Sequence, residues 1–225
     1  MRVVNYETGL DWTPSTRAQV RVSAYRADTR DEIVLVAAQR TLGYFQNLPR
    51  TRRTGVEGDA RLLVAPWLTV RGSYAHLRAT YESPARLASA LDDAEDVAPG
   101  DRLPLSPAHR YGAGVDAFHR VHGALVTGGL SLSGVSSQHL RGDEANTQPP
   151  LPAWHTIAAH LSVERARVAV TMDVTNLLDR RYETFGIYGH NSRDVDGSAL
   201  PEARVERFVT PGYPRAVTVG VVVRR

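Results

Sequence analysis

Few side chains in the sequence are spaced for metal binding. The acidic run Asp92–Asp96 offers carboxylates of the kind that bind divalent cations, but a solvated acidic loop is the commoner meaning of such a run. The segment Ser192–Gly197 resembles the first half of a calcium-binding loop, yet Ala203 stands where that loop requires a bidentate Glu. We therefore expect no resident metal ion.

The histidines do not form a metal-binding or catalytic set either. His119 and His122 lie in a predicted short turn with no third ligand nearby, and His155 and His160 point to opposite faces of one predicted strand. The sequence contains no serine elbow, no glycine-rich phosphate loop and no helix carrying paired catalytic groups. We expect neither catalytic residues nor a cofactor.

Charge and composition exclude several function classes. The 225 residues include 27 Lys+Arg, all of them Arg, and 24 Asp+Glu, so the formal charge is 27 − 24 = +3. Such a small excess gives little electrostatic reason to expect a nucleic-acid partner. The absence of cysteine excludes disulfides and thiolate sites. No run of about 18 apolar residues predicts a transmembrane helix, and no apolar signal-peptide segment is visible after Met1.

Apolar and polar residues alternate over most of the chain. From residue 17 to 24 the even positions are Ala or Val and the odd positions are Arg, Gln or Ser, and the last such row is Val217, Val219, Val221 and Val223. A period of two predicts β-strands with one apolar face. The predicted strands cover residues 3–11, 17–37, 43–64, 67–81, 107–118, 123–137, 153–164, 166–177 and 214–224.

The connections between these strands alternate in length. The short ones are 11–16, 65–66, 119–123 and 164–166, and the long ones are 38–43, 82–106, 138–152 and 178–214. Short turns at one end and long loops at the other are typical of an outer-membrane β-barrel, whereas a soluble β-sandwich gives no reason for this asymmetry. About nine strands would leave two open edges, which lipid does not tolerate. Either one strand is missed, or the chain is a portion of a larger barrel, which the lack of a visible signal peptide favours.

Six short motifs follow one another along the chain. The most specific are Val174–Tyr182 (VTNLLDRRY) and Pro211–Arg215 (PGYPR). The other four lie within residues 5–9, 25–33, 45–57 and 103–110. Together they resemble the C-terminal part of the β-barrel of TonB-dependent outer-membrane receptors, siderophore receptors in particular. The two specific motifs are similar to the family's V-x-N-L-[FL]-[DN]-x-x-Y and P-G-x-P-R.

The resemblance implies an all-β fold, an antiparallel transmembrane β-barrel of about 22 strands. Residues 1–225 would be its C-terminal portion of about nine meander strands, with short periplasmic turns and long extracellular loops, and with the plug domain and N-terminal strands absent. Architectural roles are expected for Asn176, Leu177, Asp179, Tyr182, Pro211, Gly212, Pro214 and Arg215. Candidates for the aromatic girdles are Trp67, Tyr74, Tyr81, Tyr111, Trp154 and Tyr182. Arg225 shares the parity of the lipid-facing valines, where the family usually ends in an aromatic residue.

The resemblance also implies a function. It predicts an outer-membrane receptor that takes up a ferric siderophore or a similar scarce ligand. Its partners would be outer-membrane lipid, the barrel-assembly machinery and, in the full-length family member, the TonB–ExbB–ExbD energy complex. Without a plug, this chain alone should perform no active uptake. Candidate ligand contacts are the polar tips of the last two loops, namely His139, Arg141, Tyr188, His190 and Arg193.

Two other function classes remain open. An outer-membrane β-barrel enzyme would need a catalytic set on the extracellular rim, where only His139, His190 and loop acids are available. A soluble β-sandwich or lipid-binding barrel would fold in plain buffer. The basic run Arg50–Arg53, on a strand expected to project beyond a bilayer, would either attract an anionic ligand or lipopolysaccharide phosphates or form a solvated rim.

Overall fold

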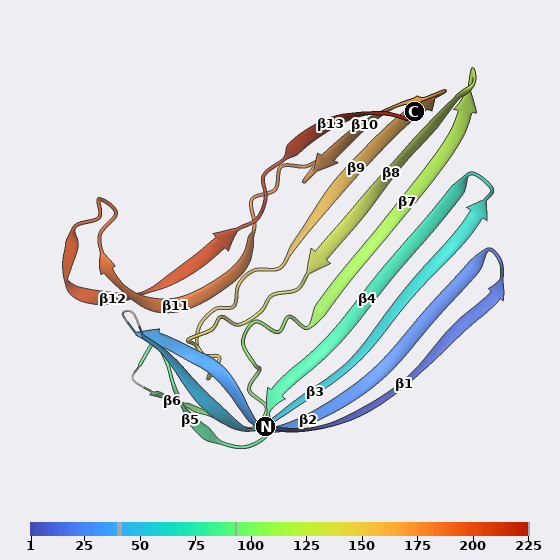
Figure 1. Cartoon of the computed structure of the whole chain (residues 1–225). Coiled ribbons are helices and arrows are strands. Elements are labelled where there is room, and N and C mark those ends of the chain that lie inside the picture. Colours follow the sequence, from blue (N-terminus) through green and yellow to red (C-terminus); the bar gives the residue numbers. More distant parts are fainter. Residues whose placement is uncertain (40–41, 93, 225) are drawn as a thin grey trace.

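The regular elements of the chain are β-strands. The computed structural model describes residues 1–39, 42–92 and 94–224. Nine strands form one antiparallel sheet in the order β1-β2-β3-β4-β7-β8-β9-β10-β13, which curves around the remaining elements (Figure 1). No α-helix able to cross a bilayer occurs in the described part of the chain. Arg225, which was predicted to share the lipid-facing side of the last strand, lies outside the described residues. Residues 40–41 of the predicted loop 38–43 also lie outside them.

The nine predicted strands all occur in this sheet, with ends within four residues of the prediction. Their bounds are β1 (Arg2–Ser15), β2 (Ala18–Gln39), β3 (Leu42–Ala65), β4 (Leu68–Tyr81), β7 (His109–Val121), β8 (Ala124–Val135), β9 (Trp154–Arg165), β10 (Val168–Thr175) and β13 (Ala216–Val223). Neighbouring strands of this sheet pair by simple meander connections, except that β4 pairs with β7 and β10 pairs with β13, each across a long loop.

Two of the predicted long loops contain hairpins that the sequence analysis did not anticipate. β5 (Ala85–Ala88) pairs with β6 (Ala94–Val97), and β11 (Glu183–Arg193) pairs with β12 (Ala199–Pro211). Both hairpins lie within the predicted long loops, whose positions between the wall strands agree with the prediction. The pairing satisfies backbone groups that the folded loops would otherwise bury without partners.

One face of the sheet is apolar and has no second layer over it in the described part of the chain. Its side chains are widely exposed, with Val217, Val219 and Val221 at 60–64%. A β-sandwich would cover this face with a second sheet. An exposed apolar face is what a wall facing lipid hydrocarbon requires.

The alternation reverses near the loop end of β2. Asp31 has a positive φ of 55° and no partner in the ladder, between the pairs Arg30↔Arg50 and Glu32↔Leu48. Beyond it, the Glu32 carboxylate turns to the concave face and lies 2.9 Å from the Arg53 guanidinium, while Ile33 becomes exposed. The register is the same on both sides of Asp31, so this residue is not a β-bulge; its left-handed backbone turns the side chains that follow to the other face.

The hydrophobic core lies beneath the loops on the concave side of the sheet, not behind the apolar face (Figure 1). Its buried members are Leu48, Ala79, Tyr81, Leu87, Val97 and Leu103. They join the loop ends of β3 and β4 to the segment 82–106. We use the name loop cluster for residues 82–106 and 138–152, which pack together at this end.

The structure corrects two members of the predicted aromatic girdles. Tyr81 has the parity opposite to Tyr74, so its ring turns into the core and is 1% exposed. Trp154 shares the parity of His160 on the concave face, and its ring centroid lies 4.7 Å from that of Tyr182. Tyr74 and Tyr111 face each other in register and are exposed at 48% and 38%. Tyr6 and Trp12 of β1 are also exposed, and neither was among the predicted girdle residues.

Candidate ligand-binding site

The concave face of the sheet carries a band of paired charges. Arg21 Nε lies 3.1 Å from Asp11 Oδ2 across β1 and β2. Arg71 of β4 forms an ion pair with Asp116 of β7, and His160 Nε2 of β9 lies 3.6 Å from the same carboxylate. Charges that alternate with lipid-facing apolar residues belong in a hydrated lumen. The concave face is therefore a polar wall.

A glycine makes room for the centre of this band. A Cβ built on Gly129 would lie 2.4 Å from the His160 ring and 2.5 Å from an Asp116 oxygen. Any larger residue would push the two groups apart. The glycine thus permits β7 and β9 side chains to meet across β8.

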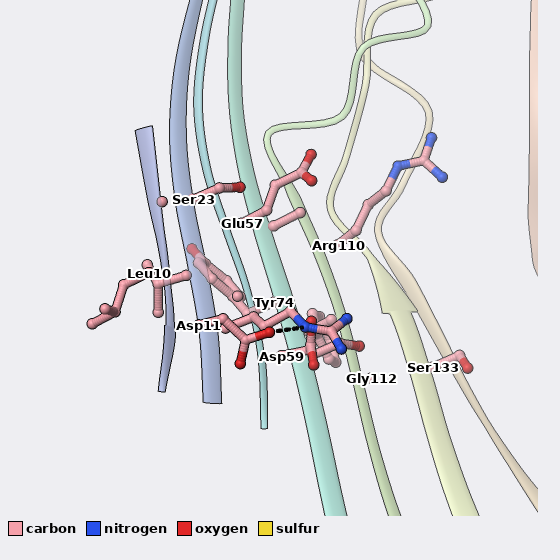
Figure 2. A pocket seen from close by; sticks show the side chains of 16 residues that line it. Leu10, Asp11, Ser23, Glu57, Asp59, Tyr74, Arg110, Gly112 and Ser133 are labelled. Carbon is pink, nitrogen blue, oxygen red and sulfur yellow. Dashed lines mark hydrogen bonds and ion pairs between the residues drawn. The ribbon is translucent and has the colours of Figure 1, made fainter. Parts of the chain in front are cut away.

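A shallow hollow of about 750 Å³ lies on the same wall. Figure 2 shows Glu57, Arg110 and Ser133 extending to one side of the sheet, while Leu10 points to the other. The lining combines carboxylates, guanidinium groups and hydroxyls from β1 to β8. Such a surface can hold a polar ligand or polypeptide by hydrogen bonds.

The loop cluster closes over a buried carboxylate. Glu144 is 0% exposed; the Tyr81 hydroxyl donates to its Oε2 at 2.8 Å, and the Gly142 N–H donates to its Oε1 at 3.2 Å. Arg141 Nε lies 4.0 Å from Oε1. These contacts tie the loop 138–152 to the end of β4.

A second carboxylate joins the two loops. Glu95 Oε2 accepts hydrogen bonds from the backbone N–H groups of Glu144, at 2.8 Å, and Ala145, at 3.2 Å. Asn146 adds a reciprocal pair, accepting from the Arg102 N–H at 2.6 Å and donating to its carbonyl at 3.0 Å. The prediction of a solvated acidic loop is therefore wrong for Glu95, which holds the neighbouring loop in place.

Burial changes the acidity of both carboxylates. Desolvation raises the pKa of Glu144 above its ordinary value, although Arg141 and the Tyr81 hydroxyl act in the opposite direction. Desolvation likewise raises the pKa of Glu95. Within the described residues, no three His, Asp or Glu side chains are arranged to hold a metal ion. The two carboxylates thus serve the packing of the loops.

The structure brings together three of the five predicted ligand contacts. Tyr188 of β11 donates its backbone N–H to the Arg141 carbonyl at 2.8 Å. His139 Nδ1 lies 3.8 Å from Asp143 Oδ2 on the same loop. Burial, and secondarily the Asp143 charge, raises the pKa of Tyr188. The hairpin β11–β12 therefore docks on the loop cluster through this contact.

The other two predicted contacts lie farther along the hairpin. His190 is half-buried and pairs with Val205. Arg193 is exposed and donates from Nη1 to the Gly197 carbonyl at 2.8 Å, within its own turn. These two residues do not join the contact between Arg141 and Tyr188.

The motif Val174–Tyr182 shapes the exit from β10. Asn176 and Asp179 both have positive φ, 46° and 51°. The Asn176 side chain accepts from the Arg180 N–H at 2.9 Å and donates to the carbonyls of Arg180 and Tyr213. The exposed Leu177 donates its N–H to the Ile157 carbonyl at 2.7 Å. The motif thus turns the chain out of the sheet and ties it to the segment before β13.

The second motif completes this junction. The Gly212 N–H donates to the Tyr182 carbonyl at 2.7 Å, and a Cβ on Gly212 would lie 2.2 Å from the Tyr182 ring. Arg215 donates its N–H to Asp179 Oδ1 at 3.1 Å. Pro211 is the last residue of β12, and Pro214 lies two residues before β13. The two motifs therefore contact each other directly.

Several residues of this site were missed by sequence reasoning. Glu144 stands in no recognisable motif, and its contacts with Tyr81 and Glu95 cross 63 and 49 residues of sequence. Asp116 and Arg71 were detectable in principle, because each occupies a polar position of an alternating strand. The sequence alone does not show which of those positions meet.

Comparison with known proteins identifies the family. Residues 1–177 match the family model described as "TonB dependent receptor-like, beta-barrel". The chain belongs to the TonB-dependent receptor family. No curated protein matches the chain. The predicted family is confirmed, and with it the partial antiparallel transmembrane barrel with short periplasmic turns and long extracellular loops.

Solved TonB-dependent barrels share the fold. The ferric yersiniabactin uptake receptor FyuA from Yersinia pestis superposes with a TM-score of 0.72 at 20% identity, over 98% of this chain and 29% of that one. The siderophore receptor PiuA from Acinetobacter baumannii gives 0.70 at 16%, over 98% and 28%. The copper transporter OprC gives 0.69 at 16%, over 98% and 30%. The chain thus spans less than a third of each of these proteins.

The family assignment also decides between the function classes. TonB-dependent receptors are outer-membrane proteins that transport ligands and are not enzymes. The β-barrel enzyme hypothesis is therefore set aside.

Proposed function

We propose that the chain is the C-terminal wall of an outer-membrane receptor that takes up a ferric siderophore or a similar scarce ligand. The names of the structural neighbours support this ligand class, because FyuA, PiuA and the ferric-catecholate import receptor Fiu from E. coli all carry siderophores or their iron complexes. The copper transporter OprC shows that the same fold also serves another metal.

The edges of the sheet support the proposal that residues 1–225 are one portion of a larger barrel. Within the described residues, β1 and β13 each pair on one side only. An unpaired strand edge in hydrocarbon leaves backbone N–H and C=O groups without partners, at several kcal/mol each. The missing partners would be the N-terminal strands of the barrel, and the plug would occupy the polar concave face.

The docking of β11–β12 on the loop cluster carries the proposal for the ligand site. The contact between Tyr188 and Arg141 brings the last two long loops together at the extracellular mouth. Guanidinium and imidazole groups there would bind the anionic oxygens of a ferric chelate. His139, Arg141, Tyr188, His190 and Arg193 are the proposed contacts.

The proposed partners follow from this role. The lipid-facing rows require outer-membrane lipid, and insertion requires the barrel-assembly machinery. Energy from TonB–ExbB–ExbD reaches such a receptor through its plug, so this chain alone should bind without transporting.

The experiment combines surface binding with accumulation. Cells expressing residues 1–225 alone are given ⁵⁵Fe-labelled ferric citrate and ferric catecholates, with and without an uncoupler of the membrane potential. The proposal predicts no energy-dependent accumulation by this chain, and accumulation once the plug and remaining strands are supplied. Energy-dependent uptake by residues 1–225 alone would contradict it.

The binding residues are tested in the completed receptor. His190→Ala should weaken binding of the transported chelate, and His119→Ala, near the periplasmic end of β7, serves as the matched control. Equal affinity of both variants and the wild type would remove the β11–β12 hairpin from the ligand site.

A further inference from the structure

An arginine-rich recess lies on the lipid-facing side of β1, β2 and β3, at their extracellular ends. It has a volume of about 280 Å³, and its lining includes five arginines and two carboxylates. The arginines are Arg2, Arg26, Arg30, Arg50 and Arg52, and the carboxylates are Asp28 and Glu82. All five arginines occupy even positions, as do the lipid-facing Tyr6, Val22 and Val56 of the same strands.

Three of these arginines form a straight row across the strands. Arg2 stands opposite Arg30, and Arg30 stands opposite Arg50. All three are exposed. Like charges directly opposite each other on one face of a sheet destabilise it. The row therefore favours an anion that lies over it.

The neighbouring carboxylates already pair with other arginines. Asp28 lies one row nearer the membrane centre, whereas Glu82 stands beside Arg50 in the arginine row and donates its N–H to the Arg50 carbonyl at 2.9 Å. Asp28 lies 2.7 Å from both Arg26 and Arg52, and Glu82 lies 2.5 Å from Arg52. The described part of the chain supplies no ion pair to Arg2, Arg30 or Arg50. An anion from outside the described residues would neutralise the arginine row.

The height of the arginine row matches the polar surface of the outer leaflet. Tyr6 is 64% exposed on the same face, and aromatic side chains of this kind mark the level of the headgroups. Arg2 lies four residues nearer the extracellular end of β1 than Tyr6. This separation is about 13 Å along the strand, at about 3.3 Å per residue. Because strands of such barrels tilt by about 40°, the arginine row lies just beyond the hydrocarbon.

We propose that Arg2, Arg30 and Arg50 bind the phosphate groups of a phosphorylated glycolipid in the outer leaflet. Planar guanidinium groups form bidentate hydrogen bonds with phosphate, and a phosphate relieves the repulsion between the three cations. A membrane lipid holds its phosphate at this height and on this face, which a freely diffusing phosphate does not. This proposal rests on the orientation of the barrel and not on the identity of the transported ligand.

The test measures lipid A binding by the folded protein in detergent. Bis-phosphorylated lipid A is titrated against the wild type and the double variant Arg30→Gln/Arg50→Gln, with fully dephosphorylated lipid A and inorganic phosphate as comparison probes. The double variant should bind bis-phosphorylated lipid A about tenfold more weakly, a change of about 1.4 kcal/mol. Arg21→Gln/Arg61→Gln removes two arginines from the concave side of the same strands and should leave the affinity unchanged.

A second measurement needs no variant. Bis-phosphorylated lipid A should raise the unfolding midpoint of the wild type in urea, and dephosphorylated lipid A should not. Equal binding of both lipids, unchanged affinity in Arg30→Gln/Arg50→Gln, competition by equimolar inorganic phosphate, or an unchanged midpoint would each overturn the proposal. None of these outcomes bears on whether the receptor transports a ferric chelate.

Discussion

The barrel wall and the loop cluster place their apolar side chains in opposite environments. On the wall, Val219 and Val221 are 64% exposed and face outward, whereas in the loop cluster Leu87 is 0% exposed and faces inward. Apolar side chains of one chain therefore lie in two environments, the lipid around the wall and the protein interior of the loop cluster. The wall relies on lipid to cover its apolar face, and the loop cluster makes its own small core.

The two regions are therefore destabilised by different substitutions. A polar group on the wall is costly when it faces outward and harmless when it faces the lumen. In the loop cluster the rule is that of a water-soluble domain, because cavities and unpaired buried polar groups are what destabilise it.

The largest expected effect comes from opening a cavity in the loop cluster. Leu87→Ala removes a fully buried side chain and should destabilise the packing of the loops by about 2–5 kcal/mol. Leu130→Ala shortens a wall side chain that is 49% exposed, and lipid fills the space. Hydrogen exchange of residues 82–106 measures the effect of each variant on the loop cluster. Equal effects of the two variants would contradict the distinction between the loop cluster and the wall.

A charge on the wall should have the next largest effect. Val170→Arg places a guanidinium on the lipid-facing side of β10 and should cost about 2–4 kcal/mol of folding free energy in a bilayer. The matched control is Thr171→Arg, whose side chain faces the lumen. Urea unfolding in lipid vesicles measures the difference, and similar costs for both would contradict the assigned faces.

The buried carboxylate makes the loop cluster sensitive to pH. Because burial raises the pKa of Glu144 above its ordinary 4.5, its contribution to stability is fully present below pH 4.5 and is lost as the pH rises through the raised value. Glu144→Gln should remove its share of this dependence while keeping a partner for the Tyr81 hydroxyl. Glu144→Ala leaves that hydroxyl unpaired and should cost about 1–3 kcal/mol.

The stability of the loop cluster is measured with a fluorescent label at Ser137→Cys, in urea titrations from pH 4 to pH 8. Increasing stability of the wild-type loops toward pH 8, with the same trend in Glu144→Gln, would show that the buried carboxylate does not control them.

The smallest effect is expected at the exposed ion pairs of the lumen. Arg21 and Asp11 side chains are 57% and 55% exposed, and such pairs contribute about 0–1 kcal/mol. Arg21→Gln should shift the unfolding midpoint in vesicles only slightly, and this shift should vanish at high salt. A loss as large as that of Leu87→Ala would show that the lumen wall is not solvated.

The sequence predicts the wall well because its signal is local. Nine alternating segments give nine wall strands, and the valine row 217–223 lies on the exposed face as expected. The loop cluster escapes prediction because its contacts join distant segments, as between Tyr81 and Glu144. Tyr81 occupies an odd position of β4 and the outward-facing Tyr74 an even one, so alternation along the strand already predicts that Tyr81 faces inward.

Local conformation accounts for another failure. Strict alternation through β2 would place Glu32 on the outward face, but the positive φ of Asp31 reverses the parity. Asp tolerates that region better than most residues, yet nothing in the pattern marks this position. For the candidate site, the sequence predicted which residue types occur but not which side chains contact each other.

The central claim, that the apolar face meets lipid, is most directly tested by single cysteines along β13. The chain has no native cysteine, so residues 217–223 can each be replaced and spin-labelled without background. In vesicles, odd positions should be accessible to lipid-soluble oxygen and even positions to a water-soluble nickel chelate, with a period of two. Odd positions that neither reagent reaches would place the valines in a dry protein interior and contradict the account.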